Sequence, residues 1–428
     1  MTSGAMKYKL HKPQKPEAAF GVLLFWAMAL FCNVCIAGNK VKTISVGDAL
    51  DNRCEINLSR IAKSIEYIPL DNGGRFDGLL IDDRRLTLRI GESGDFLIYQ
   101  KDRGQDLLKI FSSAGQFKSS KISYGRGPGE FMNGVHSIAE FGNTLVLLDY
   151  CNAIIYRDGE FVKTLRLWDF YPGGCFFNNI KLLDNNRLLV LYDYKNEGRV
   201  SIFDLANNKI VDDVAIRGTY AGKDGKSIVI NGETQTFSSV VAMFGMCKSI
   251  GNSFTCASSG CDTIFAVSNN LNSLIVEPLY EMDFGKYRKG SAMIDFYMGG
   301  LHIHAPAEHN NTYSESESHL FFCVLFSFKK YPNIPQPQRW VPIVYDKVNG
   351  KTHSLKFNKK FNTIGFVNDI DGGMPFWPRY HIGNKLYKFV SAPEFIFMAS
   401  KSSSAKMKEV AAKLTEESNP VLVVVTLK

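Results

Sequence analysis

Residues 144–161 read TLVLLDYCNAIIYRDGEF, and this stretch decides the fold expected for the chain. It holds a first apolar run at 145–149, a polar break, a second apolar run at 154–156, and a turn at Asp158-Gly159. Short aliphatic and aromatic runs bounded by Asn, Asp and Gly are typical of strands joined by tight turns. The stretch therefore predicts one antiparallel sheet unit.

The same unit recurs along the chain. Clear copies occupy 96–117 and 188–204, and weaker copies begin near Phe254, Leu320 and Leu386. The starting points lie about 43 to 66 residues apart, which is the period of propeller blades, each a small antiparallel sheet. A β-sandwich is the competing interpretation, but it does not explain units with a common period. We predict an all-β fold, a six-bladed β-propeller.

The C-terminal region predicts one short helix and the closure of the ring. Residues 407–414 carry apolar side chains at the spacing i, i+3, i+4 and i+7, which is one face of a helix, and Pro420 follows it. Residues 421–427 then have the pattern of a buried strand. We expect this strand to complete a blade built from the other end of the chain, with 41–46 or 61–70 as its partner.

Two polar segments interrupt the repeats. Residues 216–239 are rich in Gly and polar residues, and we expect an extended hairpin or loop there. Residues 302–319 form the longest polar stretch, and we expect an exposed insertion.

The N-terminus has the pattern of an export signal. Four lysines lie between residues 7 and 15, an almost wholly apolar run covers 21–35, and small residues at 35–37 offer a cleavage site. We predict a signal peptide at 1–37 and a single propeller domain at 38–428, exported to the periplasm or cell envelope. The alternative is a retained anchor or a lipoprotein, and only then would the protein associate with a membrane.

Charge does not indicate a nucleic-acid partner. The formal net charge is +8, and it falls to +5 without the four lysines and one glutamate of residues 1–37. No basic cluster of any length occurs, so a surface that follows phosphates is not expected. Seven cysteines remain outside the signal, an odd number, and no Cys-x-x-Cys occurs among them, so neither a complete disulfide framework nor a thiolate zinc site is expected.

Three ordered motifs carry a resemblance to a known family. Residues 125–131 (GRGPGEF), 369–378 (DIDGGMPFWP) and 417–422 (ESNPVL) resemble segments of the exported six-bladed β-propeller proteins of gut Bacteroidetes. The likeness extends from about Asn57 to the C-terminus. It implies the propeller fold and an exported location, often with a lipid anchor, but no reaction. This chain departs at the anchor, because no cysteine of the N-terminus follows suitable small residues.

The first candidate binding site is the Gly-rich segment 125–131. Backbone amides of such segments can hold an anion, and Arg126 and Glu130 supply charged side chains. The competing interpretation is a tight turn between blades, with glycines at positive φ and Phe131 packed between the blades.

The second candidate combines charge with an aromatic side chain. Asp371, Trp377 and Arg379, together with Asp369, offer hydrogen-bonding groups beside an indole, a set suited to a sugar or a peptide. The competing interpretation is a blade corner, with Trp377 in the core and Asp371 capping a turn.

The third candidate is a metal site at His302 and His304. A His-x-His pair on a strand directs both rings to one side, a usual start for a divalent metal site. The competing interpretation is a solvated loop. Apart from this alternative, we expect no cofactor.

These observations favour binding over catalysis. The chain has no Gly-x-Ser-x-Gly and no His-Glu-x-x-His segment. We expect a scaffold for a protein, small-molecule or glycan ligand and not an enzyme. The alternative is a metal-assisted hydrolase or lyase with its site in the central funnel.

Overall fold

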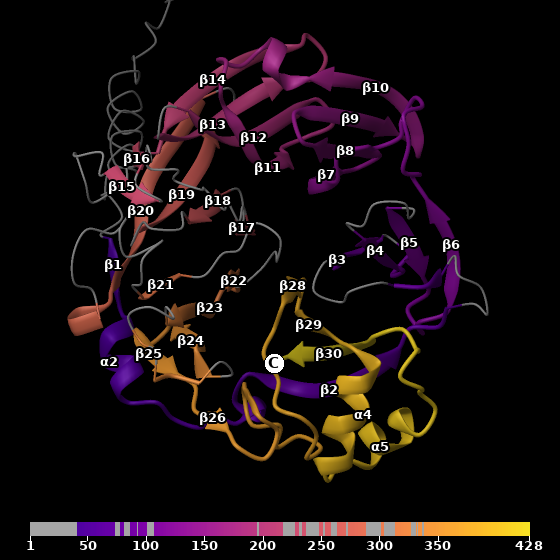
Figure 1. The fold of residues 1–428 in the computed structure, drawn as a ribbon, viewed down its shortest axis with the longest axis vertical. Coiled ribbons are helices and arrows are strands. Elements are labelled where there is room, and N and C mark those ends of the chain that lie inside the picture. The colour runs from indigo at the N-terminus through magenta and orange to yellow at the C-terminus, as the bar shows by residue number, and fades with distance from the viewer. Residues whose placement is uncertain are drawn as a thin grey trace, which may run out of the picture. The chain divides into compact units, whose positions relative to one another are not determined.

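Six sheets, antiparallel apart from one parallel pair, follow one another around a ring within Lys42–Lys428, which confirms the predicted six-bladed β-propeller (Figure 1). The computed structural model describes residues 41–72, 78–80, 86–91, 93–100, 107–194, 197–216, 227–230, 233–236, 248–250, 253–257, 263–270, 273–287, 301–303, 313–326, 331, 333–335 and 338–428. The predicted signal peptide lies outside these residues.

The first three blades are built from consecutive strands, and each is named here by its order in the chain. Blade 1 contains β3 (Leu86–Ile90), β4 (Phe96–Gln100), β5 (Leu108–Phe111) and β6 (Phe117–Lys121). Blade 2 contains β7 (Val135–Phe141), β8 (Thr144–Asp149), β9 (Asn152–Arg157) and β10 (Glu160–Arg166). Blade 3 contains β11 (Phe176–Leu182), β12 (Arg187–Tyr194), β13 (Glu197–Asp204) and β14 (Lys209–Ala215). In each, the first strand lies nearest the centre of the ring (Figure 1).

Blades 4 and 6 each include a strand from the N-terminal region, whereas blade 5 is again built from consecutive strands. Blade 4 contains β17 (Lys248–Ile250), β18 (Ser253–Ala257), β19 (Thr263–Asn270), β20 (Ser273–Asp283) and β1 (Lys42–Ser45). Blade 5 contains β21 (Leu301–Ile303), β22 (Tyr313–Glu315), β23 (His319–Phe326), β24 (Trp340–Asp346) and β25 (Lys351–Ser354). Blade 6 contains β28 (Tyr380–Ile382), β29 (Lys385–Val390), β30 (Val421–Leu427) and β2 (Ala62–Pro69).

The sequence repeats mark the same position in every blade. The six starting points lie at or near the beginning of β4, β8, β12, β18, β23 and β29, which are the second strands of blades 1 to 6. Second strands are covered by neighbouring blades on both faces, so they carry the longest apolar runs.

The core is divided among the blade interfaces. Each of six clusters of buried apolar residues joins two neighbouring blades. Strand β12 shows why its run is continuous: Leu188, Val190 and Tyr192 pack toward blade 2, and Leu189 and Leu191 pack toward blade 4. Alternate side chains of a strand point to opposite faces, so both faces of β12 are apolar because both are buried.

Two N-terminal strands tie the ring together. Strand β30 pairs antiparallel with β2, with Ile65 opposite Val425, so the partner predicted at 61–70 is confirmed. The other proposed partner, 41–46, lies elsewhere, because β1 pairs parallel with β20 of blade 4 and places Ile44 opposite Met282. The N-terminal region therefore contributes an outer strand to two different blades.

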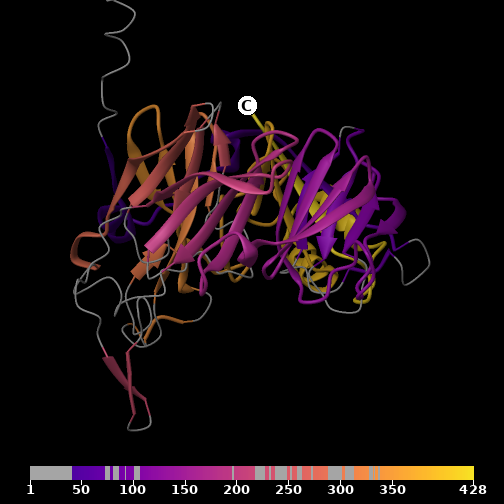
Figure 2. The same ribbon diagram turned by 90° about the horizontal axis from the view of Figure 1, so that it is seen from above.

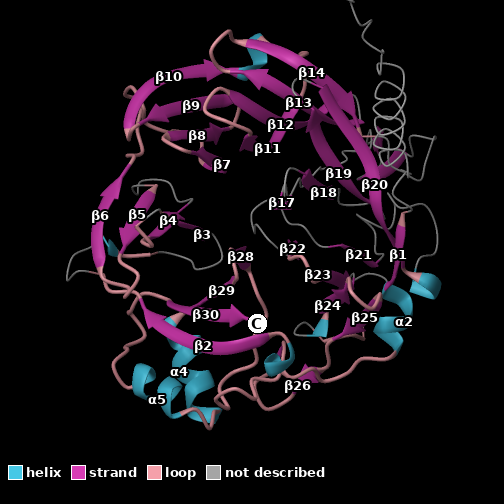
Figure 3. Cartoon of the chain, turned by 180° about the vertical axis from the view of Figure 1, so that it is seen from behind, coloured by secondary structure: helices cyan, strands magenta, loops and turns pink. Residues whose placement is uncertain are grey.

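Helices are few, and the predicted one is present at its predicted place (Figure 3). Helix α5 spans Ala405–Ala411, and the hydroxyl of Ser404 accepts a hydrogen bond from the Met407 amide at 3.1 Å. The sequence patterns did not predict α4 (Ala392–Lys401) or the short α2 (Val46–Asp51). None of the helices that the structure describes has the length and apolar character needed to span a bilayer.

The polar segments are only partly insertions. Strands β15 (Ser227–Ile230) and β16 (Glu233–Thr236) form the hairpin expected within 216–239, and it projects from the ring (Figure 2). Strands β26 (Phe357–Asn358) and β27 (Thr363–Ile364) form a second small sheet. The expectation of an exposed insertion at 302–319 is wrong at its end, because β22 pairs with β23 and Glu315 is buried.

The antiparallel order gives the ring two distinct rims. Turns between the first and second and between the third and fourth strands of blades 2 and 3 form the hairpin rim, at 142–143, 158–159, 183–186 and 205–208. Turns between second and third strands and the connections between blades form the opposite crossover rim, which includes 150–151, 167–175 and 391–420.

Candidate functional site

The Gly-rich segment 125–131 holds its own carboxylate. Glu130 Oε2 accepts a hydrogen bond from the Gly127 amide at 2.6 Å. A Cβ atom on residue 125 would lie 2.0 Å from the same oxygen, so Gly125 permits the close approach of the carboxylate. Glu130 therefore occupies the position that an external anion would take, whereas Arg126 is exposed.

The same segment packs against blade 2. The Gly129 carbonyl accepts a hydrogen bond from the Tyr156 hydroxyl, and burial raises the pKa of Tyr156 to about 12. Phe131 is fully buried and meets Tyr124 edge-on, with ring centroids 5.6 Å apart. These contacts make the segment a fixed connection into blade 2.

Asp371 lies at the centre of a hydrogen-bond network between β2 and the helices. Its Oδ1 accepts hydrogen bonds from the Tyr67 hydroxyl at 3.1 Å, the Asn368 amide nitrogen at 2.7 Å and the Gly373 backbone amide at 3.0 Å. Its Oδ2 accepts one from the Ser404 hydroxyl at 2.7 Å. Burial and the nearby Asp371 carboxylate raise the pKa of Tyr67. The carboxylate thus joins the 368–373 turn to α5.

Trp377 and Arg379 lie on the two sides of Pro378. The Trp377 ring is partly buried and stacks on Phe366, with centroids 5.9 Å apart and planes 20° apart. Arg379 is partly exposed, and its guanidinium lies 5.6 Å from the centroid of the Tyr380 ring. Trp377 thus packs on the core between blades 5 and 6, whereas Asp371 and Arg379 are partly exposed.

The proposed metal ligands cannot be placed. His304 lies outside the described residues, and of His302 only the backbone is described, where it pairs with Leu325 in β21 and β23. Within the described part of the chain, no group of three or more His, Cys, Asp or Glu side chains could hold a metal ion.

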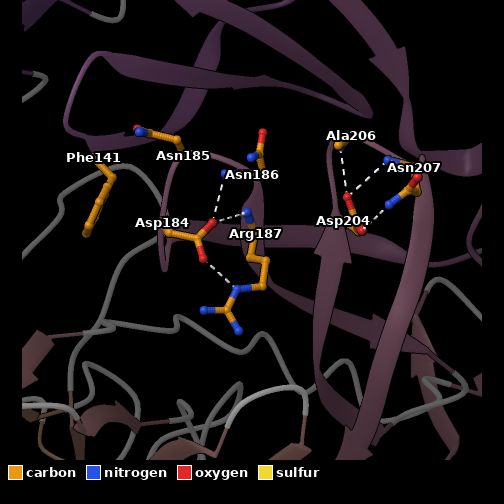
Figure 4. Close-up of a pocket in the computed structure, with 8 residues that line it drawn as sticks. All are labelled: Phe141, Asp184, Asn185, Asn186, Arg187, Asp204, Ala206 and Asn207. Carbon is orange, nitrogen blue, oxygen red and sulfur yellow. Dashed lines mark hydrogen bonds and ion pairs between the residues drawn. The ribbon is translucent and has the colours of Figure 1, made fainter.

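A groove on the hairpin rim lies between blades 2 and 3 (Figure 4). It has a volume of about 500 Å³. The groove is lined by the end of β7 and by the β11–β12 and β13–β14 turns. Its lining residues are Phe141, Asp184, Asn185, Asn186, Arg187, Asp204, Ala206 and Asn207. No sequence motif marks these residues as a site.

The walls of the groove are held by hydrogen bonds within each turn. Asp184 accepts from the backbone amides of Asn186 and Arg187, both at 2.8 Å, and from Arg187 Nε at 2.6 Å. Burial alone would raise the pKa of Asp184, but these bonds hold it below its usual range. Asp204 fixes the next turn through the amides of Ala206 and Asn207. The groove is therefore preformed, with Phe141 47% exposed at its edge.

Exposed apolar side chains are concentrated on blade 2 and its flanks. Of the eleven large exposed apolar residues in the described part of the chain, seven lie between residues 124 and 176. These seven are Tyr124, Met132, Phe141, Tyr150, Phe161, Val162 and Phe176. These side chains are close in sequence and lie on both rims, since Phe141 is at the hairpin rim and Tyr150 at the crossover rim.

An aromatic pair, Tyr150 and Trp168, lies on the crossover rim beside blade 2. Tyr150 is 49% exposed and meets Trp168 edge-on, with centroids 5.2 Å apart. In the sequence, Tyr150 lies in the polar break between two apolar runs and nothing marks Trp168, so no local signal distinguishes these rings from buried ones.

Comparisons with known proteins agree with the fold. A protein of Bacteroides fragilis assigned as exported has 15% identity, covering 91% of this chain and 100% of that chain, with a TM-score of 0.60. A member of the DUF4221 family from Bacteroides vulgatus has 13% identity, covering 87% and 98%, with a TM-score of 0.43, on which no argument rests. No curated protein matches the chain.

A family model supplies the classification. The model described as "Domain of unknown function (DUF4934)" matches residues 41–426, which is nearly the whole described propeller. The chain belongs to the family of this domain, DUF4934.

Proposed function

We propose that the protein is an exported binding scaffold that holds its ligand or partner on blade 2 and its flanks. One observation carries this proposal: seven of the eleven large exposed apolar side chains of the described residues lie between residues 124 and 176. Exposing such side chains costs free energy that a partner recovers by covering them.

The rigid frame supports binding over chemistry. The carboxylates Glu130, Asp184 and Asp371 each accept hydrogen bonds from their own turns, which leaves them positioned as structural groups. A general base must instead reach a proton of the substrate. A preformed surface binds with little loss of conformational entropy.

Export is part of the proposal. The pattern of residues 1–37 supports a signal peptide, and the similar protein of Bacteroides fragilis is assigned as exported. The ligand would then be met in the periplasm or cell envelope.

Site-specific photo-crosslinking tests the proposal. A benzophenone amino acid replaces Phe176, which is 59% exposed, and in a control variant it replaces Phe397 of α4, which is 49% exposed. Each full-length variant is irradiated in a Bacteroides envelope extract, and adducts are stained for protein and for sugar. We expect a defined adduct from position 176 alone. Equal labelling at both positions, or none at 176, would overturn the proposal, and conversion of the captured ligand to a product would indicate an enzyme.

A further inference from the structure

The aromatic pair Tyr150–Trp168 is held rigidly on the crossover rim. The turn that carries Tyr150 is fixed on one side by Asp149, whose carboxylate accepts a hydrogen bond from the Met132 amide at 2.9 Å. On the other side the Cys151 carbonyl accepts a hydrogen bond from the Leu167 amide at 2.8 Å. The turn is thereby joined to the segment that bears Trp168.

The indole ring is also fixed. Trp168 Nε1 donates a hydrogen bond to the Cys175 carbonyl at 3.2 Å, and the ring packs against the core between blades 2 and 3. The indole therefore needs no ordering when a ligand arrives, which lowers the entropic cost of binding.

Tyr150 adopts a backbone conformation that a bulky residue rarely takes. Its φ is +58°, in the left-handed region where Gly or Asn would be favoured. Its ring is nevertheless half-exposed, so little burial offsets the strain. Strained residues that persist are concentrated at functional sites.

Charged side chains of both signs flank the pair. The Arg166 guanidinium carbon lies 5.8 Å from the centroid of the Trp168 ring, and Arg166 Nε lies 3.9 Å from Asp169 Oδ1. Both side chains are 61% exposed, so their remaining hydrogen-bonding groups can reach a ligand. The guanidinium offers donors, the carboxylate offers acceptors, and their charges balance.

We propose that Tyr150, Trp168, Arg166 and Asp169 form a binding platform for a neutral carbohydrate. This inference rests on the proposed binding function and names its ligand class. A sugar ring has an apolar face that stacks on an aromatic ring, and hydroxyls that both donate and accept hydrogen bonds. The balanced charge pair fits hydroxyls and gives no net attraction for an anionic or cationic ligand.

Affinity electrophoresis tests the platform directly. The full chain is run in native gels that contain mannan, xyloglucan or dextran, with polygalacturonate as the charged comparison. We expect retardation by at least one neutral polysaccharide and none by polygalacturonate. No retardation by any neutral polysaccharide would overturn the inference.

Three variants locate the site. Tyr150→Gly removes the ring and relaxes the backbone, and we expect it to weaken binding about tenfold or more. Arg166→Ala should weaken it less, whereas Phe397→Ala, which removes an equally exposed ring from α4, should leave it unchanged. Binding that is equal in Tyr150→Gly and the unaltered chain would overturn the platform.

The outcomes separate this inference from the proposed function. An adduct at position 176 that stains only for protein, together with no retardation by the neutral polysaccharides, would keep the binding function and overturn the carbohydrate. No adduct at position 176 but retardation that depends on Tyr150 would keep the platform and overturn the wider binding surface.

Discussion

Blade 2 and the closing side of the ring, formed by blades 5 and 6, use polar and aromatic residues in opposite ways. In blades 5 and 6 two carboxylates serve the fold: Glu315 has a side chain 1% exposed and forms an ion pair of 2.5 Å with Lys347, and Asp371 links three elements. In blade 2 the aromatic rings of Tyr150 and Phe141 face solvent.

The difference indicates which parts of this fold stabilise the ring and which parts are open to a ligand. Blade 6 holds together β2 and β30, which come from the two ends of the chain, and Asp371 fastens its turn to α5. Glu315 fastens blade 5 to blade 4, because it accepts hydrogen bonds from Tyr280 and Thr255, both at 3.2 Å. Blade 2 is built from consecutive strands, and its turn at 150–151 carries the exposed ring of Tyr150.

The largest expected effect comes from breaking the buried ion pair. Lys347→Ala leaves the Glu315 carboxylate buried without its cation, and we expect a loss of about 3–5 kcal/mol in the free energy of unfolding, measured by denaturation in urea. The control Lys413→Ala removes a surface pair with Glu409, whose side chains are 67% and 72% exposed, and should leave the free energy of unfolding nearly unchanged. Similar losses in both variants would contradict the assigned role of Lys347.

The second effect concerns the network of blade 6. Asp371→Ala leaves the Tyr67 hydroxyl and the Asn368 amide without an acceptor, and we expect a loss of about 3 kcal/mol. Asp371→Asn keeps an acceptor oxygen and should cost about 1 kcal/mol. Thermal unfolding of the two variants checks the order, and sugar binding at blade 2 should survive in both. A loss of sugar binding in the folded Asp371→Asn variant would contradict the assignment of Asp371 to the fold and of blade 2 to binding.

The third effect has the opposite sign. Tyr150→Gly removes a strained positive φ, and we expect the free energy of unfolding to rise by about 1 kcal/mol. Phe397→Ala, which removes a ring of equal exposure from α4, should not raise it. Denaturation in urea measures both. A clear loss of stability in Tyr150→Gly would show that the ring serves the fold, contrary to the comparison.

The smallest effect is a pH dependence on the closing side. Burial, together with the positive charges of Arg60 and Lys347, lowers the pKa of His319 below its ordinary value of 6.5. Below about pH 6.5 the unfolded chain therefore binds a proton that the folded protein resists, so this contribution to stability is present above that pH and is lost as the pH falls.

Thermal unfolding followed from about pH 7 to about pH 5.5 checks the sign. We expect the midpoint of His319→Gln to fall less than that of the unaltered chain, by on the order of 1 °C. His353, whose pKa is also lowered by burial, contributes in the same direction. An identical pH dependence in His319→Gln would exclude His319 as a source.

The candidate sites show which features of a site local sequence patterns can predict. The sequence singled out Trp377 as a candidate ligand-binding residue and did not mark Trp168, yet Trp377 stacks on Phe366 and Trp168 supports an exposed tyrosine. Whether a ring is covered depends on the neighbouring blade, which lies tens of residues away in the chain. The role of Glu130 was hidden for a related reason, because only the folded turn brings its carboxylate to the Gly127 amide.

The sequence by itself determined the number of blades, the position of each second strand, the short helix α5 and the closing strand β30. These features follow from alternation and spacing within a few residues, which record burial on the two faces of a strand. Tertiary structure alone decided that β1 joins blade 4, that Glu315 is buried against Lys347, and that Tyr150 faces solvent. The reason is that pairing partners and exposure are properties of surfaces brought together by closure of the ring, and no local pattern encodes them.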